Sequence, residues 1–163
     1  MVAAAAALVE KAANLSTKQW AGATGVLEQA RAVRAKSLEL IEEDAQAYLA
    51  FVAALRASTN QELAESQEAV AAAHARTVDV PLRMTRAAAE IAELAVQLAQ
   101  HGNPNLRADA VVAATLAAAA AESGLTLIAA NLADAADDGR LAVARKLAGR
   151  ATGLARSLRT PDS

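Results

Sequence analysis

One short stretch of this 163-residue chain gathers most of the side chains that could bind or activate a small molecule. Residues 102–109 (Gly-Asn-Pro-Asn-Leu-Arg-Ala-Asp) supply two amides, a guanidinium and a carboxylate around a turn. Amides offer paired donors and acceptors, and a carboxylate can stabilise a cation or relay protons. The same residues also suit a capped helix start, with Asp109 favoured by the helix dipole. From the residues alone, that structural interpretation stands first.

A second candidate is an acid on the longest predicted helix. Asp44 and Tyr48 are one turn apart and therefore share a helix face. Glu42 and Glu43 flank Asp44, so a solvated acidic ridge is the competing explanation.

A third candidate is Lys18 with Trp20, which follow the first predicted helix. In a chain with one Trp, a packing anchor is favoured over a stacking platform. The two histidines, His74 and His101, stand alone in the sequence. We therefore expect neither a histidine base nor a metal site.

The totals exclude several functional classes. The chain has no cysteine, which rules out disulfides, thiolate metal sites and a Cys nucleophile. A net charge of −2 argues against a nucleic-acid surface, and the Lys and Arg residues near the C-terminus are expected to form a solvated helix face. The apolar opening lacks a basic leader, and the apolar run 108–121 is judged too short to span a bilayer. These features predict a cytoplasmic protein that binds neither nucleic acid nor membrane.

The positioning elements are long helices. Hydrophobic residues make up 55% of the chain and aromatic residues only 2%, so the apolar content is mostly Ala, the best helix former. The sequence predicts one all-α domain over residues 1–163, an up-and-down bundle of long Ala-rich helices. Six helices are expected, ending near Asn14, Ala57, Thr77, Gly102, Asp137 and Leu158.

Several local signals define these helices. Pro81 is expected to begin the fourth helix, and Asn105 to cap the fifth. Residues 16–19 (Ser-Thr-Lys-Gln) and Thr59 with Glu62 are predicted capping boxes. Along the second helix, apolar positions alternate three and four apart, which predicts one buried seam: Leu38, Ile41, Ala45, Tyr48, Val52 and Leu55. Ala-rich helix faces also pack well against another copy, so the bundle is expected to be dimeric.

These stretches, in this order, resemble the formiminotetrahydrofolate cyclodeaminase / methenyltetrahydrofolate cyclohydrolase family, which includes the C-terminal domain of formiminotransferase-cyclodeaminase. The most specific piece is Gly102 to Ala110, similar to a Gly-Asn-x-Asn-x-x-Ser-Asp-Ala motif. The supporting pieces are residues 44–48 (Asp-Ala-Gln-Ala-Tyr), 80–82 (Val-Pro-Leu) and 131–132 (Asn-Leu), and 14–16 with Lys18 and Trp20.

The resemblance implies an all-helical homodimer with a folate-type molecule bound near the subunit interface. It implies cyclisation of 5-formiminotetrahydrofolate with release of ammonia, or hydrolysis of 5,10-methenyltetrahydrofolate, with no metal or redox cofactor besides this substrate. Asp109 is the first and Asp44 the second expected catalytic carboxylate. Asn103 and Asn105 are expected to hold the pterin, and Lys18 or Arg107 the glutamate tail. The expected substrate-binding residues are therefore Asn103, Asn105, Arg107, Lys18 and Tyr48.

The chain departs from the family pattern in three places. It opens at Met1-Val2-Ala3, without the glycine-rich segment that precedes the family's first helix, so this segment either lies upstream of the sequence or is missing from the protein. Ala108 stands where the motif has Ser, and Leu127 where the family has Asn. These departures leave open an alternative, a non-catalytic family member that serves as a helical oligomeric or ligand-binding module.

Overall fold

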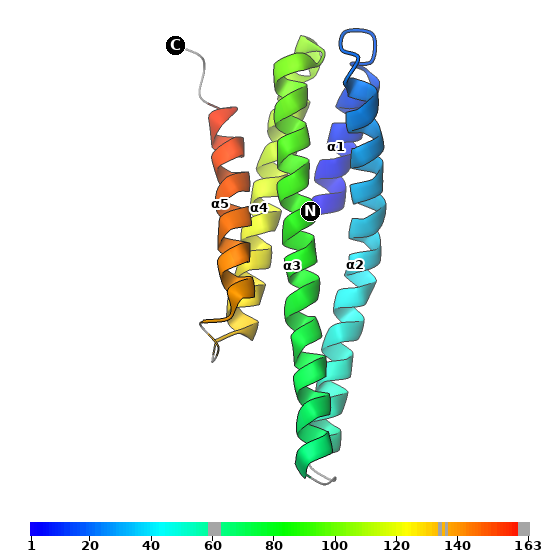
Figure 1. Ribbon diagram of the computed structural model, residues 1–163. Coiled ribbons are helices and arrows are strands. Elements are labelled where there is room, and N and C mark those ends of the chain that lie inside the picture. Colours follow the sequence, from blue (N-terminus) through cyan, green and yellow to red (C-terminus); the bar gives the residue numbers. More distant parts are fainter. Residues whose placement is uncertain (59–62, 134, 136, 160–163) are drawn as a thin grey trace.

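The protein is a bundle of long helices in the computed structural model, which describes residues 1–58, 63–133, 135 and 137–159 (Figure 1). Within these residues there is no strand, which confirms the all-α prediction. The helices are α1 (Val2–Asn14), α2 (Ala23–Ser58), α3 (Leu63–His101), α4 (Arg107–Asn131) and α5 (Gly139–Ser157), with a 3-10 turn η1 (Pro104–Leu106) before α4.

The core is built mainly from alanine. α4 packs against α3, α5 and α1, and α2 packs against α3 and α1. Small side chains allow helix axes to approach closely. The fully buried residues of α4 are almost all of this kind: Ala110, Ala113, Ala114, Ala117 and Ala121.

α4 carries a longer apolar stretch than the run 108–121 that the sequence interpretation considered. Together with η1 it spans Pro104–Asn131, and an 18-residue stretch within this span has a mean hydropathy of 1.7, enough to cross a membrane by length and composition. The prediction that its apolar run is too short is therefore wrong. Core helices of globular bundles have the same composition, and α4 packs against α1, α3 and α5. Its packing therefore does not indicate a membrane protein, and the cytoplasmic location stays a prediction.

The predicted helix break between Thr77 and Pro81 is also wrong, because α3 continues through Pro81. Proline has no N–H, so it leaves the carbonyl four residues earlier without its helical partner. That carbonyl belongs to Thr77, and it accepts a hydrogen bond from Nδ2 of Asn131 on α4 (2.7 Å). A side chain from the neighbouring helix thus replaces the bond that Pro81 removes.

Two predicted helix caps, Ser16 and Asn105, are also wrong. Ser16 caps no following helix, because α2 begins at Ala23. Its Oγ instead donates to the Ala12 carbonyl (2.7 Å) and accepts from the Asn103 N–H (2.9 Å). Asn105 is not the cap before α4, since the Asn103 side chain accepts from the Asn105 N–H (3.1 Å) and caps η1. α4 ends at Asn131 rather than near residue 137, and the Thr59–Glu62 box lies outside the described residues.

The α2 seam (Leu38, Ile41, Ala45, Tyr48, Val52 and Leu55) is not buried as predicted. Leu38 is 54% exposed, Ile41 56% and Tyr48 63%. α1 and α3 pack against the other side of α2, where the buried residues include Val33, Ser37, Leu40 and Ala47. The periodicity therefore identifies an apolar face that has no partner within the described chain.

Asp138 is the N-cap of α5. Its carboxylate accepts hydrogen bonds from the Arg140 guanidinium (2.7 Å) and from the Arg140 backbone N–H (2.8 Å). The guanidinium also donates to Asp79 on α3 (2.9 Å). These hydrogen bonds from Arg140 lower the pKa of Asp138 to about 2. The bond from the Arg140 side chain has the largest effect, and the bond from the Arg140 backbone N–H the second largest. Arg140, held by Asp138, thus links the start of α5 to α3.

We expect the Tm to fall as the pH is lowered from 3.8 to about 2. A depressed native pKa gives stability that is present above the unfolded-state pKa and is lost as the pH falls through the folded-state pKa. Asp138→Ala should flatten that part of the Tm–pH curve and lower the Tm at neutral pH by about 3 °C. Asp137→Ala, which removes a neighbouring exposed carboxylate, is the matched control in thermal melts. Identical curves for the two variants would contradict this assignment.

Candidate functional site

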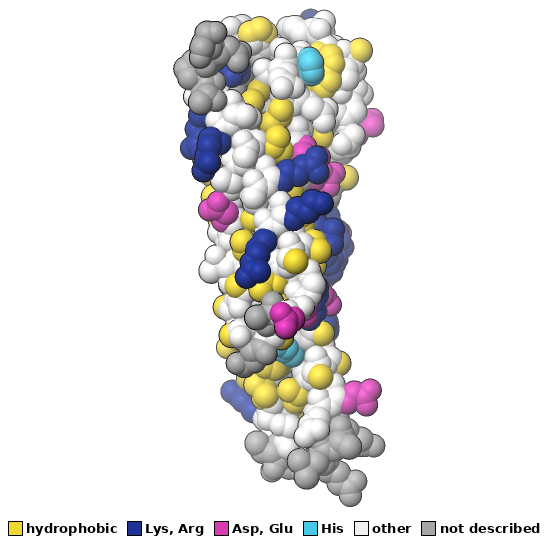
Figure 2. All heavy atoms as spheres, turned by 60° about the vertical axis from the view of Figure 1, so that its left-hand side comes forward, with side chains coloured by type: hydrophobic (Ala, Val, Ile, Leu, Met, Phe, Trp, Pro, Cys, Tyr) yellow, Lys and Arg dark blue, Asp and Glu magenta, His cyan; other side chains and the backbone are white. Residues whose placement is uncertain are grey.

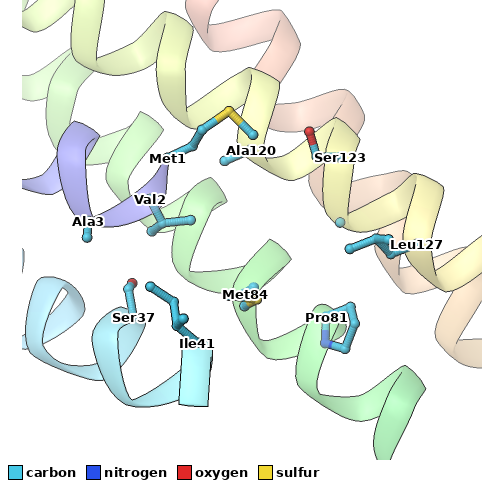
Figure 3. A pocket seen from close by; sticks show the side chains of 11 residues that line it. Met1, Val2, Ala3, Ser37, Ile41, Pro81, Met84, Ala120, Ser123 and Leu127 are labelled. Carbon is cyan, nitrogen blue, oxygen red and sulfur yellow. The ribbon is translucent and has the colours of Figure 1, made fainter. Parts of the chain in front are cut away.

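The candidate site is a groove where α2, α3 and α4 meet beside the start of α1. Its larger hollow has a volume of about 290 Å³ and is lined by Asp44, Tyr48, Phe51, Thr77, Pro81, Leu127 and Asn131. A second hollow of about 190 Å³ shares Pro81 and Leu127 with the first (Figure 3). We call the two together the central groove. Ligand sites are typically concave and largely apolar, with a few polar groups that fix orientation.

The second hollow is mostly apolar. Figure 3 shows Val2 of α1, Ile41 of α2, Met84 of α3 and Leu127 of α4 around it. Two hydroxyls, of Ser37 and Ser123, are the polar side chains among its lining residues. Each donates its proton to a carbonyl one turn earlier in its own helix (2.7 Å), so each keeps only acceptor capacity toward the hollow.

Asn131 is held in place by groups on α3. Its Nδ2 donates to the Thr77 carbonyl that Pro81 leaves free (2.7 Å), and its backbone carbonyl accepts from Nε2 of His74 (2.9 Å). The His74 ring in turn lies against Phe51 of α2, with the ring centroids 5.2 Å apart. Among the described residues no group donates to Oδ1 of Asn131, so this oxygen can accept a hydrogen bond from a ligand in the groove.

Asp44 brings a carboxylate to the groove. It does not form a solvated acidic ridge with Glu42 and Glu43, which was the competing interpretation of the sequence. Glu43 forms ion pairs with Arg83 of α3 and with Lys36. The Arg83 hydrogen bond is the largest cause that lowers the pKa of Glu43. Glu42 accepts from Gln46 on the exposed side (2.9 Å). For Asp44 the structure records no ion pair within the described residues, so its half-buried carboxylate is available to a ligand.

The end turn, residues 102–109, lies at the other end of α4. Asp109 forms an ion pair with Lys11 of α1 (3.0 Å), and Arg107 donates to the Leu158 carbonyl (3.3 Å). Asn103 caps η1, while Asn105 is exposed. Neither hollow of the central groove is lined by a residue of the end turn. In the described part of the chain, the side chains of Asn103, Arg107 and Asp109 are thus engaged in holding helix ends together.

The surroundings of Gly102 leave no room for a side chain, which explains why the end turn has a glycine there. A Cβ at this position would lie 2.6 Å from the Leu98 carbonyl oxygen and 2.9 Å from Oγ of Ser16. Trp20 packs on the core beside it, with its ring 5.4 Å from that of His101. The packing-anchor interpretation of Trp20 is confirmed, and Lys18 is exposed in the loop between α1 and α2.

The predicted site residues therefore fall into two groups. Asp109 and Asn131 are about six turns apart on α4, which is about 33 Å. The structure brings Asp44 and Tyr48 together with Asn131, and leaves Asn103, Asn105, Arg107, Asp109 and Lys18 at the other end of the bundle. The sequence analysis missed Phe51, His74 and Thr77. The available signal was Pro81, because a proline within a helix predicts a free carbonyl at Thr77.

The basic residues near the C-terminus lie on the surface. Figure 2 shows Lys and Arg side chains gathered along the face over α5. Arg145, Lys146, Arg150 and Arg156 are all exposed, and Arg150 pairs with Glu93 of α3 (3.0 Å). These four residues match the solvated helix face that the sequence predicts, whereas Arg140 of the same basic group is half-buried and pairs with Asp79 and Asp138. Among the described residues, no three His, Asp or Glu side chains are grouped closely enough to hold a metal ion.

Comparisons with known proteins agree on the fold and the family. The family model described as formiminotransferase-cyclodeaminase matches residues 1–148. Among solved structures, the chain is similar to formiminotetrahydrofolate cyclodeaminase from Thermotoga maritima, with a TM-score of 0.83 and 22% sequence identity. That match covers 97% of this chain and 81% of the other. At this identity the likeness establishes the helical fold. No curated protein matches the chain.

Proposed function

This chain belongs to the formiminotransferase-cyclodeaminase family, and from that membership we propose that it is a folate-dependent enzyme of one-carbon metabolism with its active site in the central groove. The observation that carries the proposal is the unpaired Asp44 carboxylate in a hollow with apolar walls and one fixed amide. The leading reaction is cyclisation of 5-formiminotetrahydrofolate to 5,10-methenyltetrahydrofolate.

Asp44 is proposed to serve two needs of that reaction. N10 of the folate attacks the formimino carbon and loses its proton, while the formimino nitrogen gains protons and leaves as ammonia. A carboxylate beside these atoms can accept the N10 proton and pass it to the departing nitrogen. The product is an amidinium-like cation, and the negative charge of Asp44 stabilises it as it forms.

The other groove residues are proposed to bind the substrate. The flat pterin suits the apolar walls formed by Phe51, Pro81 and Leu127, with Oδ1 of Asn131 and the Tyr48 hydroxyl as hydrogen-bonding partners. The end turn lies too far along α4 to touch the same reacting atoms. In this proposal Asp109, Asn103, Asn105 and Arg107 therefore stabilise the bundle rather than act on the substrate.

Hydrolysis of 5,10-methenyltetrahydrofolate is the second candidate. Asp44 is only half-buried, so water reaches the carboxylate. A carboxylate that accepts a proton from N10 can equally accept one from a water that attacks the methenyl carbon. The two reactions share the methenyl cation and differ in the group that is added or lost.

The test follows the absorbance of 5,10-methenyltetrahydrofolate with purified protein. An increase from 5-formiminotetrahydrofolate, with release of ammonia, would support the cyclodeaminase. A decrease from added methenyl compound, above the rate without protein, would support the cyclohydrolase. If neither rate exceeds that of buffer, the enzymatic proposal fails and the non-catalytic alternative is favoured. Binding of tetrahydrofolate by calorimetry would then show whether the groove still takes a ligand.

A further inference from the structure

Asn131, the last residue of α4, is bound to α3 at two points, one on its backbone and one on its side chain. Its carbonyl accepts a hydrogen bond from Nε2 of His74 (2.9 Å), and its Nδ2 donates to the carbonyl of Thr77 (2.7 Å). His74 and Thr77 are three residues apart and therefore lie on the same face of α3. Two bonds to one helix fix both the position of Asn131 and the plane of its amide.

The backbone bond meets a need of α4 itself. The last four carbonyls of a helix have no N–H partner within that helix. At the end of α4 the N–H of Leu132 donates to the carbonyl of Ile128. Among the described residues, no backbone N–H donates to the carbonyl of Asn131. The ring of His74 supplies this donor from the neighbouring helix.

The same contacts fix the state and the place of the His74 ring. A carbonyl oxygen only accepts, so Nε2 of His74 carries a proton whether the ring is neutral or charged. The ring lies against Phe51 of α2, with the ring planes tilted by 48°. The larger hollow of the central groove is lined by Phe51, Thr77 and Asn131, but not by His74. His74 therefore connects residues that line the hollow without lining it.

We propose that His74 is a positioning residue of the central groove. Its Nε2–H holds the backbone of Asn131 while the Thr77 carbonyl holds Nδ2, so that Oδ1 of Asn131 stays in place as a hydrogen-bond acceptor for the ligand. Binding groups work best when neighbouring contacts lock their rotamers in this way. The identity of the ligand rests on the proposed function, in which this oxygen accepts from the pterin. The hydrogen bonds themselves need no ligand.

Two substitutions separate the donor of His74 from its packing. His74→Gln keeps an N–H donor at the ε position and loses the ring, whereas His74→Leu keeps an apolar side chain and loses the donor. His74→Leu should raise KM for the folate substrate about 10-fold and leave kcat within about twofold, because Asn131 binds the ground state and the transition state alike. His74→Gln should keep KM within about threefold of the parent value.

A double-mutant cycle tests whether His74 acts through Asn131. Asn131→Ala removes Oδ1 but keeps the backbone carbonyl that His74 binds. It should raise KM about 10-fold, and adding His74→Leu should raise KM no further. Effects that multiply to about 100-fold would overturn the proposal, since His74 would then act independently of Oδ1.

His101→Leu is the matched control. His101 is also on α3 and also lies against an aromatic ring, that of Trp20, with the ring centroids 5.4 Å apart. It lies at the end turn, away from the central groove. The same substitution there should leave KM at the parent value. A KM raised as much as in His74→Leu would show a general effect of losing a packed histidine and would overturn the proposal.

NMR of the ¹⁵N-labelled 16.6 kDa protein tests the hydrogen bonds without any substrate. The ring nitrogens of His74 should show a proton on Nε2, and a neutral ring protonated on Nδ1 would overturn the proposal. The side-chain amide signals of Asn131 are identified by their loss in Asn131→Ala. They should be protected from exchange in the parent, His74→Gln and His101→Leu, and should exchange rapidly in His74→Leu. Unchanged protection in His74→Leu would overturn the proposal.

Circular dichroism checks that each variant is folded. If His74→Leu does not fold, the ring nitrogens of the parent and the His74→Gln variant carry the test. A folded His74→Gln with a raised KM and a rapidly exchanging Asn131 amide would overturn the proposal.

The two proposals fail in different ways. If the parent neither turns over nor binds tetrahydrofolate, the proposed function fails, and the NMR comparison alone decides the role of His74. If the parent is active but KM does not follow the donor at position 74, the proposed function stands and the positioning role is removed.

Discussion

Asp44→Asn is expected to lower kcat for the folate reaction by about 100- to 1000-fold, with a much smaller change in KM. The substitution keeps the size and shape of the side chain but removes the negative charge and the site that accepts a proton. Both are needed only as the cation forms, so the loss should appear in kcat. Steady-state kinetics of the methenyl absorbance change measures both constants.

Asp109→Asn is the matched control, because it makes the same chemical change in the carboxylate that the sequence motif favours. Asp109 is paired with Lys11 at the end of α4, so its loss should leave kcat within about twofold of the parent and change stability only slightly. The opposite pattern, a large loss at Asp109 and near-normal turnover at Asp44, would move the active site to the end turn and contradict the central groove.

The helices could be predicted from composition and breaks, but the continuity of α3 could not. Pro81 follows Asp79, a combination that usually marks a new helix start. Its effect depends on whether the freed Thr77 carbonyl finds another donor, and the donor is Asn131, more than fifty residues later. Local sequence holds no information on such a contact. The break was therefore predicted where tertiary packing maintains the helix.

The α2 seam was recognised by its period, but its burial within the bundle was predicted wrongly. A run of apolar positions three and four apart identifies a face, but a second helix of the same chain and a second copy produce the same pattern. α3 packs instead on the side with Leu40 and Ala47. That side is less conspicuous in sequence because it contains small and polar residues such as Ser37.

The candidate site was predicted in part. Asp44 and Tyr48 were identified by their spacing, and both line the central groove. The end turn attracted more weight because it carries the most specific part of the family motif, although its residues alone favoured a capped helix start. Adjacency in sequence says little about whether side chains face a cavity or satisfy helix ends, and here Asn103 and Asp109 do the latter.

Gly124→Ala is expected to destabilise the protein by about 2 kcal/mol, which lowers the Tm by about 6 °C for a chain of this length. A Cβ on Gly124 would lie 2.2 Å from Oγ1 of Thr85, a fully buried side chain on α3. That oxygen donates to the Pro81 carbonyl (2.8 Å), so it cannot turn away without losing its bond. The contact therefore forces α3 and α4 apart at this point.

A matched control separates this contact from the general effect of replacing glycine in a helix. Gly149 of α5 has nothing within 4 Å of its Cβ position. Gly149→Ala should therefore stabilise the protein by up to about 1 kcal/mol, through helix propensity alone. If Gly124→Ala raised the Tm in the same way, the close approach of α3 and α4 would be contradicted.

A double-mutant cycle identifies the atom responsible. Thr85→Ala removes Oγ1 and opens space for the new methyl group, so the double variant should be more stable than the sum of the single effects by about 1 to 2 kcal/mol. Leu127 and Pro81 line both hollows of the central groove. Gly124 lies within one turn of Leu127 on α4, and Thr85 lies about one turn from Pro81 on α3. The spacing that Gly124 permits therefore sets the width of the groove, and Gly124→Ala should weaken folate binding where Gly149→Ala does not.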